Sequence, residues 1–168
     1  YTSSSTEASH IPNVSDQMEF HRVKECLAAV LEDETQLHLF QLLAGILHLG
    51  NVMFQENDSA DQVVDVTEDT KEAFNAASRL LGFEAEEFFN CLAKQNMYVN
   101  NNIIVKVQNL SQTLDKKHSL AKNIYCHVFS WLIDKLNSTI TVSDRASTWG
   151  FIGLLDIYGF ENFDLLNS

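Results

Sequence analysis

Residues 35–50 read TQLHLFQLLAGILHLG, and this stretch decides the fold because apolar residues recur in it at helical spacing. Apolar side chains occupy most sides of the predicted helix and not a single stripe. A helix that is apolar nearly all round is expected to be buried. We therefore predict a central buried helix from about Thr35 to Leu49. Gly50 is expected to end it in the left-handed conformation common after helices.

Helical patterns flank this central helix on both sides. An earlier helix begins at Ser15, whose hydroxyl can cap its first turn. Thr67 is expected to cap a third helix that Gly82 ends, and residues 84–94 form a fourth. The longest helical pattern runs from about residue 111 to 137. Most of the chain is therefore predicted to be helical.

Five shorter segments have strand character. Residues 51–55 and 62–66 are rich in β-branched or apolar side chains and lie on either side of an acidic loop. Residues 97–99 and 103–107 flank three asparagines, which tolerate positive φ. Residues 149–156, WGFIGLLD, form a nearly continuous apolar run that is typical of a strand buried on both faces. The predicted fold class is mainly α: a helical bundle-like fragment with two small β-hairpins and one C-terminal core strand.

Composition excludes several classes of protein. With 168 residues, 45% of them hydrophobic, and a mean hydropathy of −0.10, the chain can bury a core. A formal net charge of −12 disfavours generic binding of nucleic acid or anionic lipid. No apolar run approaches the roughly 18–20 residues of a membrane span. The three cysteines, 26, 91 and 126, are too far apart for a zinc motif, and we expect them to be reduced core thiols.

Positive charge is concentrated in one part of this acidic chain. Residues 94–122 contain a single acidic side chain, Asp115, and five lysines: Lys94, Lys106, Lys116, Lys117 and Lys122. Such a stretch is a candidate contact for an acidic partner. Charge alone fits a solvated face with chance clustering equally well.

The end of the predicted core strand has the chemistry of a nucleotide sensor. The strand delivers Asp156, whose carboxylate can hold Mg²⁺ through water. Gly159 lies three residues later and would let its backbone N–H approach a γ-phosphate. A plain strand followed by a turn has the same pattern, so the DxxG spacing alone leaves both interpretations open.

Longer strings carry a family resemblance. Residues 151–161, FIGLLDIYGFE, resemble the switch II segment of myosin motor domains, D-I-x-G-F-E after an apolar strand. Residues 42–54, LLAGILHLGNVMF, resemble the myosin run L-L-A-x-I-L-H-L-G-N-I-x-F. Residues 119–125 and 129–137, SLAKNIY and FSWLIDKLN, resemble a third myosin helix. All lie in the family's order and cover the chain from about residue 10 to its end.

The resemblance implies that residues 1–168 are a fragment of a larger α/β P-loop motor domain, its upper 50 kDa part ending at switch II. It implies that Asp156 lies near Mg²⁺, that Gly159 bonds the γ-phosphate and that Glu161 pairs with an arginine of switch I. ATP and Mg²⁺ would be the cofactors of the complete motor. The P-loop and switch I sequences do not occur in these 168 residues. The isolated chain is therefore expected to be inactive and to bind neither cofactor.

The second hairpin also has a counterpart in the family. It falls where myosins carry the loop that touches actin at the tip of the upper 50 kDa part. The resemblance gives five candidate contacts: Lys94, Asn100, Asn101, Asn102 and Lys106. Many myosins have an acidic or phosphorylatable residue 16 positions before the residue that is His118 here. Asn102 is neither, so regulation by that route does not carry over.

Three functional hypotheses follow. The first is a part of an actin-based, ATP-hydrolysing myosin motor that is cytoplasmic and cytoskeleton-associated. Its partners would be the actin filament and the remainder of the motor domain, with no nucleic acid and no membrane span. The second is a non-catalytic actin- or partner-binding module that lacks the P-loop. The third is a fragment of an unrelated P-loop NTPase, which the two motifs upstream of the DxxG disfavour. The myosin class is left open.

Overall fold

The computed structural model describes residues 14–59, 62–99, 102–141, 150 and 152–155. In chain order the elements are α1 (Asp16–Ala28), α2 (Asp33–Gly50), β1 (Phe54–Ser59), β2 (Gln62–Val66), the 3-10 turn η1 (Glu68–Thr70), α3 (Lys71–Leu81), α4 (Ala85–Ala93), β3 (Lys94–Val99), β4 (Asn102–Val107) and α5 (Leu110–Ile140). The prediction of a mainly helical chain with two small hairpins is confirmed.

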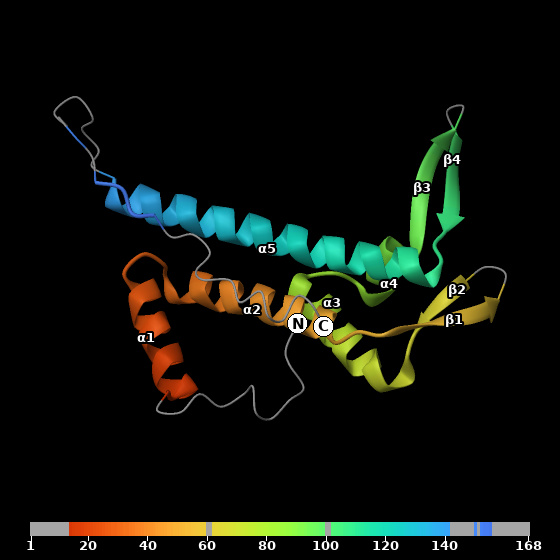
Figure 1. The fold of residues 1–168 in the computed structure, drawn as a ribbon, viewed down its shortest axis with the longest axis horizontal. Helices are drawn as coiled ribbons and strands as arrows, with labels where there is room; N and C mark the ends of the chain where they lie inside the picture. The colour runs from red at the N-terminus through yellow and green to blue at the C-terminus, as the bar shows by residue number, and fades with distance from the viewer. Residues whose placement is uncertain (1–13, 60–61, 100–101, 142–149, 151, 156–168) are drawn as a thin grey trace, which may run out of the picture.

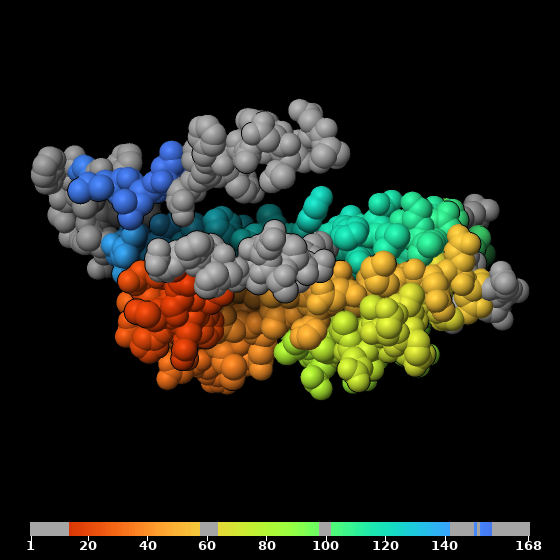
Figure 2. Space-filling model, turned by 60° about the horizontal axis from the view of Figure 1, so that its bottom comes forward, coloured from red at the N-terminus to blue at the C-terminus, as the bar shows by residue number. Residues whose placement is uncertain are grey.

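The helices form an elongated body with both hairpins at one end. α5 lies alongside α2, and α3 packs against α2 and α4 (Figure 1). α1 lies at the end opposite the hairpins and contacts α2. In the space-filling view the gold of β1 and the turquoise of the first turns of α5 lie beside each other (Figure 2). The start of α5 is thus the meeting point of the helical body and the hairpins.

Local signals explain where three of the helices begin or end. The Ser15 hydroxyl accepts a hydrogen bond from the backbone N–H of Met18, which caps α1 as predicted. Asn109 and Gln112 form a capping box at the start of α5, where each side chain accepts from the other's backbone N–H. Gly82 ends α3 with φ of 80°, also as predicted. These caps satisfy backbone groups that the helices themselves leave unpaired.

The predicted end of α2 is wrong in its geometry. Gly50 is the last residue of the helix, and Asn51 follows with a right-handed φ of −82°. The backbone N–H groups of Asn51 and Val52 donate to the carbonyls of His48 and Leu49. This tighter last turn satisfies the terminal carbonyls without a left-handed residue.

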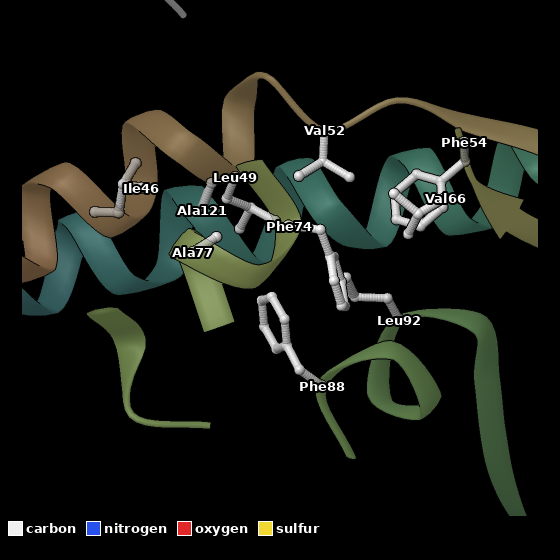
Figure 3. Close-up of a cluster of buried hydrophobic side chains, with 10 residues drawn as sticks. All are labelled: Ile46, Leu49, Val52, Phe54, Val66, Phe74, Ala77, Phe88, Leu92 and Ala121. Carbon is white, nitrogen blue, oxygen red and sulfur yellow. The ribbon is translucent and has the colours of Figure 1, made fainter. Parts of the chain in front are cut away.

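The core lies where α2, α3, α4, α5 and the first hairpin meet. Its buried members are Ile46, Leu49, Val52, Phe54, Val66, Phe74, Ala77, Phe88, Leu92 and Ala121 (Figure 3). α2 and α3 approach closely at Gly45, where an added Cβ would lie 2.8 Å from the Leu81 side chain. α2 contacts α1, α3 and α5, and most of its residues from Thr35 to Leu49 are buried or half-buried, although Leu37 and Leu47 are exposed.

The predicted C-terminal core strand does not form in residues 152–155. These residues have no regular secondary structure, and Ile152, Leu154 and Leu155 are 97, 93 and 84% exposed. A strand needs hydrogen-bonded neighbours, and each of the two observed sheets pairs only its own two strands. Within the part of the chain that the structure describes, no strand flanks this segment. The other residues of 149–156, apart from Gly150, lie outside the described residues.

Candidate functional site

The β3–β4 hairpin follows α4 in the chain without a connecting loop. Lys94 is both the C-cap residue directly after α4 and the first residue of β3. The antiparallel register is unbroken from Lys94 opposite Val107 to Val99 opposite Asn102. At the base, the backbone N–H of Gln108 donates to the carbonyl of Ala93 at 2.8 Å. The hairpin therefore projects at the end of the molecule from a short, hydrogen-bonded root (Figure 1).

The predicted contact residues are divided between the two faces of this hairpin. Lys94 is half-buried and opposite Val107, whereas Lys106 is exposed and opposite Gln95. Cross-strand partners share a face and successive residues alternate, so the two lysines lie on opposite faces. Asn102 is exposed and begins β4. Asn100 and Asn101 lie outside the described residues.

Several apolar side chains of the described part of the hairpin are exposed. Met97, Ile103, Ile104 and Val105 are 43 to 58% exposed. Sequence reasoning missed this apolar surface, although the signal was available. Three consecutive apolar residues in a two-stranded ribbon place side chains on both faces, and a hairpin that projects cannot bury both. Such a surface suits contact with another protein.

The five lysines of the basic stretch do not form one surface. Lys106 and Lys122 are exposed. Lys116 is half-buried, and its Nζ donates to the carbonyl of Lys94 at 2.7 Å. Lys117 is only 3% exposed, and its Nζ donates to the carbonyl of Val52 at 2.8 Å. The interpretation of residues 94–122 as a single basic contact is therefore wrong.

Burial changes the acid–base properties of the start of α5. It lowers the pKa of the Lys117 ammonium group, because a low-dielectric environment disfavours the charged form. The pKa of His118 is also lowered, first by desolvation and then by the nearby Lys117 charge, while Asp115 opposes the shift. Thr113 lies one turn before Lys117 and is fully buried. Its hydroxyl has no hydrogen-bond partner among the described residues.

The predicted nucleotide-sensing residues Asp156, Gly159 and Glu161 lie outside the described residues. Within the described ranges, no three His, Cys, Asp or Glu side chains come together as metal ligands would. None of the helices described is both long and apolar enough to cross a membrane. The cysteines are free thiols, as expected, but all three are exposed and not in the core.

Comparison with known proteins identifies the family. The family described as "Myosin head (motor domain)" matches residues 1–168. Myosin-3 of Arabidopsis thaliana is 39% identical over 155 residues, which is 92% of this chain and 13% of that protein. Unconventional myosin-Vb of Rattus norvegicus is 31% identical over 156 residues, again 92% of this chain but 8% of that protein. Myosin-4 of Saccharomyces cerevisiae is 32% identical over 161 residues, 92% of this chain and 10% of that protein.

The chain thus spans about a tenth of the length of these curated relatives. The match nevertheless runs from its first residue to its last, and it includes all three of the motifs quoted from the sequence. With its described residues in a mainly helical body and two hairpins, the chain belongs to the myosin head (motor domain) family.

Proposed function

We propose that this chain is part of an actin-based, ATP-hydrolysing motor, in which the β3–β4 hairpin contacts the actin filament. The observation that carries the proposal is the projection of this hairpin from a chain that matches the myosin head throughout. By the resemblance, the hairpin corresponds to the loop with which myosins touch actin. Its partners are then the actin filament and the remainder of the motor domain. Its expected location is the actin cytoskeleton of the cytoplasm.

The surface chemistry of the hairpin supports a two-part contact. The exposed ammonium of Lys106 attracts an acidic partner from a distance, which accelerates association. Met97 and Ile104, which are paired in register on the same face as Lys106, can then lose water against that partner. Charge steers the encounter, and the apolar side chains contribute to the lifetime of the complex.

Replacement of Lys106 by Glu in the full-length protein tests this contact. Affinity for actin filaments should fall mainly through the association rate, and the effect should shrink as salt screens exposed charges within about 8 Å. Lys122→Glu makes the same charge change at an exposed position of α5 outside the hairpin and serves as the control. If cosedimentation and stopped-flow binding at low salt show no difference between the two variants, this hairpin does not contact actin.

The second contribution of the chain is the switch II segment, which we propose from the resemblance of residues 151–161. The carboxylate of Asp156 is of the kind that holds Mg²⁺ through water. Gly159 would offer its N–H to the γ-phosphate, and Glu161 would pair with the switch I arginine of the complete motor. This pair is charge-assisted and becomes strong where water is excluded.

Single-turnover ATP cleavage by the full-length protein tests the switch II assignment. Gly159→Ala and Glu161→Ala should each slow cleavage by about a hundredfold or more. The first adds a methyl group against the ligand and disfavours the backbone angles that aim the N–H, and the second removes the carboxylate that pairs with the switch I arginine. Nucleotide binding measured on the same variants should stay close to that of the parent protein. Cleavage within about threefold of the parent rate would mean that the DxxG is only a turn. It would then favour the alternative of a non-catalytic actin-binding module.

A further inference from the structure

Two adjacent lysines at the start of α5 reach the roots of the two different hairpins. Lys116 Nζ donates to the carbonyl of Lys94, the first residue of β3, at 2.7 Å. Lys117 Nζ donates to the carbonyl of Val52, two residues before β1, at 2.8 Å. The side chains of consecutive helical residues point about 100° apart, so those of two neighbouring residues on α5 can reach two different elements. The hairpins lie at the end of the molecule where α5 begins (Figure 1).

Both accepting carbonyls lie just after helices. Lys94 is the extended C-cap residue that follows α4, and Val52 is the second residue after Gly50, the last residue of α2. The last turn of each helix, where the negative end of its dipole lies, is close in the chain to these acceptors. An ammonium group is therefore a well-matched donor at these two places. Each lysine joins a third element, α5, to the junction between a helix and the hairpin that follows it.

We propose that Lys116 and Lys117 are positioning residues. Lys116 fixes the direction in which β3–β4 leaves the helical body, and Lys117 fixes the root of β1–β2. The first role deepens the proposed function and rests on it in one respect, because a hairpin that contacts actin must be held at a defined angle. Neither lysine contacts the partner in this proposal.

The two contacts should differ in importance, because the hairpins are anchored differently. β1–β2 buries Phe54, Val64 and Val66 in the core. β3–β4 leaves the described side chains of Asn102 to Lys106 exposed. The second hairpin therefore depends more on hydrogen bonds at its base, namely those of Lys116 and of Gln108. Loss of the Lys116 hydrogen bond should therefore disturb the orientation of β3–β4 more than loss of the Lys117 hydrogen bond disturbs that of β1–β2.

Amide hydrogen exchange of the full-length protein without actin tests the positioning role. Lys116→Met keeps the aliphatic length and removes the donor, so exchange in residues 94–96 and 106–108 should accelerate about fivefold. Exchange in β1–β2 should stay unchanged in this variant. Lys116→Arg keeps a donor and should bring exchange back to within about twofold of the parent. Lys122→Met, the matched loss of an exposed charge on α5, should leave the hairpin at the parent rate.

Equal exchange in Lys116→Met and Lys122→Met would overturn the positioning role of Lys116. Failure of Lys116→Arg to restore the parent rate would also count against it, because a role in packing alone does not require a donor. Lys117→Met should accelerate exchange near residues 52–54 and not in β3–β4, and the opposite pattern would overturn its role. If Lys117→Met does not fold, Lys117→Arg replaces it, and slow exchange near residues 52–54 is then expected.

Actin binding by the same variants separates this inference from the function on which it rests. If Lys116→Met loosens the hairpin and weakens actin binding, both stand. If it loosens the hairpin while actin binding is unchanged in Lys116→Met and in Lys106→Glu, the positioning role stands and the hairpin is not an actin contact. If Lys106→Glu weakens binding but Lys116→Met leaves exchange unchanged, the contact stands and the positioning role fails.

Discussion

The β1–β2 hairpin turns one face into the core, whereas the β3–β4 hairpin leaves most of its described side chains in solvent. Phe54, Val64 and Val66 are buried in the first. In the second, Ile103, Ile104 and Val105 are at least half exposed. Two paired strands are only marginally stable by themselves. The comparison teaches that the first hairpin is held by burial, whereas the second is held at its root and leaves its surface available to a partner.

The largest expected effect comes from truncating one valine in each hairpin. Val64→Ala should lower the free energy of unfolding by about 2 kcal/mol, because it removes fully buried methyl groups and leaves a cavity. Val105→Ala is the same chemical change at an exposed position and should cost less than about 0.5 kcal/mol. Urea denaturation of both variants measures the difference. Equal losses would mean that the two hairpins contribute alike to stability.

A smaller effect is expected at the start of α5, which supports both hairpins. Thr113→Val replaces a buried hydroxyl that has no partner among the described residues with a methyl group of similar size. The free energy of unfolding should rise by about 1 kcal/mol, because an unpaired buried polar group is costly. Thr139→Val is the control, since that hydroxyl is exposed and donates to the carbonyl of Lys135. A loss of stability in Thr113→Val would show that the hydroxyl has a partner.

The smallest expected effect is a pH dependence of stability from Lys117. Burial lowers its pKa in the folded chain below the ordinary 10.5 of an unfolded lysine. Between these two values the unfolded chain binds more protons, so stability should rise with pH through that window. The penalty for burying the charge is fully present below the window and is relieved above it. Lys117→Met should flatten this rise in urea midpoints measured as pH approaches 10.5, and an unchanged slope would contradict the assignment.

Features of the fold that depend on a few neighbouring residues could be predicted from the sequence. Ser15 and Gly82 act through backbone groups within one turn, and both were predicted correctly. Gly50 was not, because a tight last turn satisfied the end of α2 by another route. Residues 152–155 were expected in a buried strand, which needs neighbouring strands that their own sequence does not supply. Long-range partners therefore set the limit of prediction.

The candidate site shows the same limit. Strand alternation within the predicted hairpin was enough to put Lys94 and Lys106 on opposite faces once the register was known. The burial of Lys117 was not predictable from its charge, because its acceptor on Val52 lies 65 residues away in the sequence. The exposure of Cys26, Cys91 and Cys126 has a similar cause. Helical spacing defines a face, but only the packed neighbours decide whether that face is covered.

The length of α5 has a mechanical consequence. Its 31 residues, at a rise of about 1.5 Å each, form a helix about 46 Å long. One end is tied to the hairpin roots through Lys116 and Lys117, and the other ends at Ile140. For a straight helix of this length, a tilt of about 5° about one end displaces the other end by about 4 Å. A small rotation of α5 at its hairpin end would thus displace its far end by several ångströms.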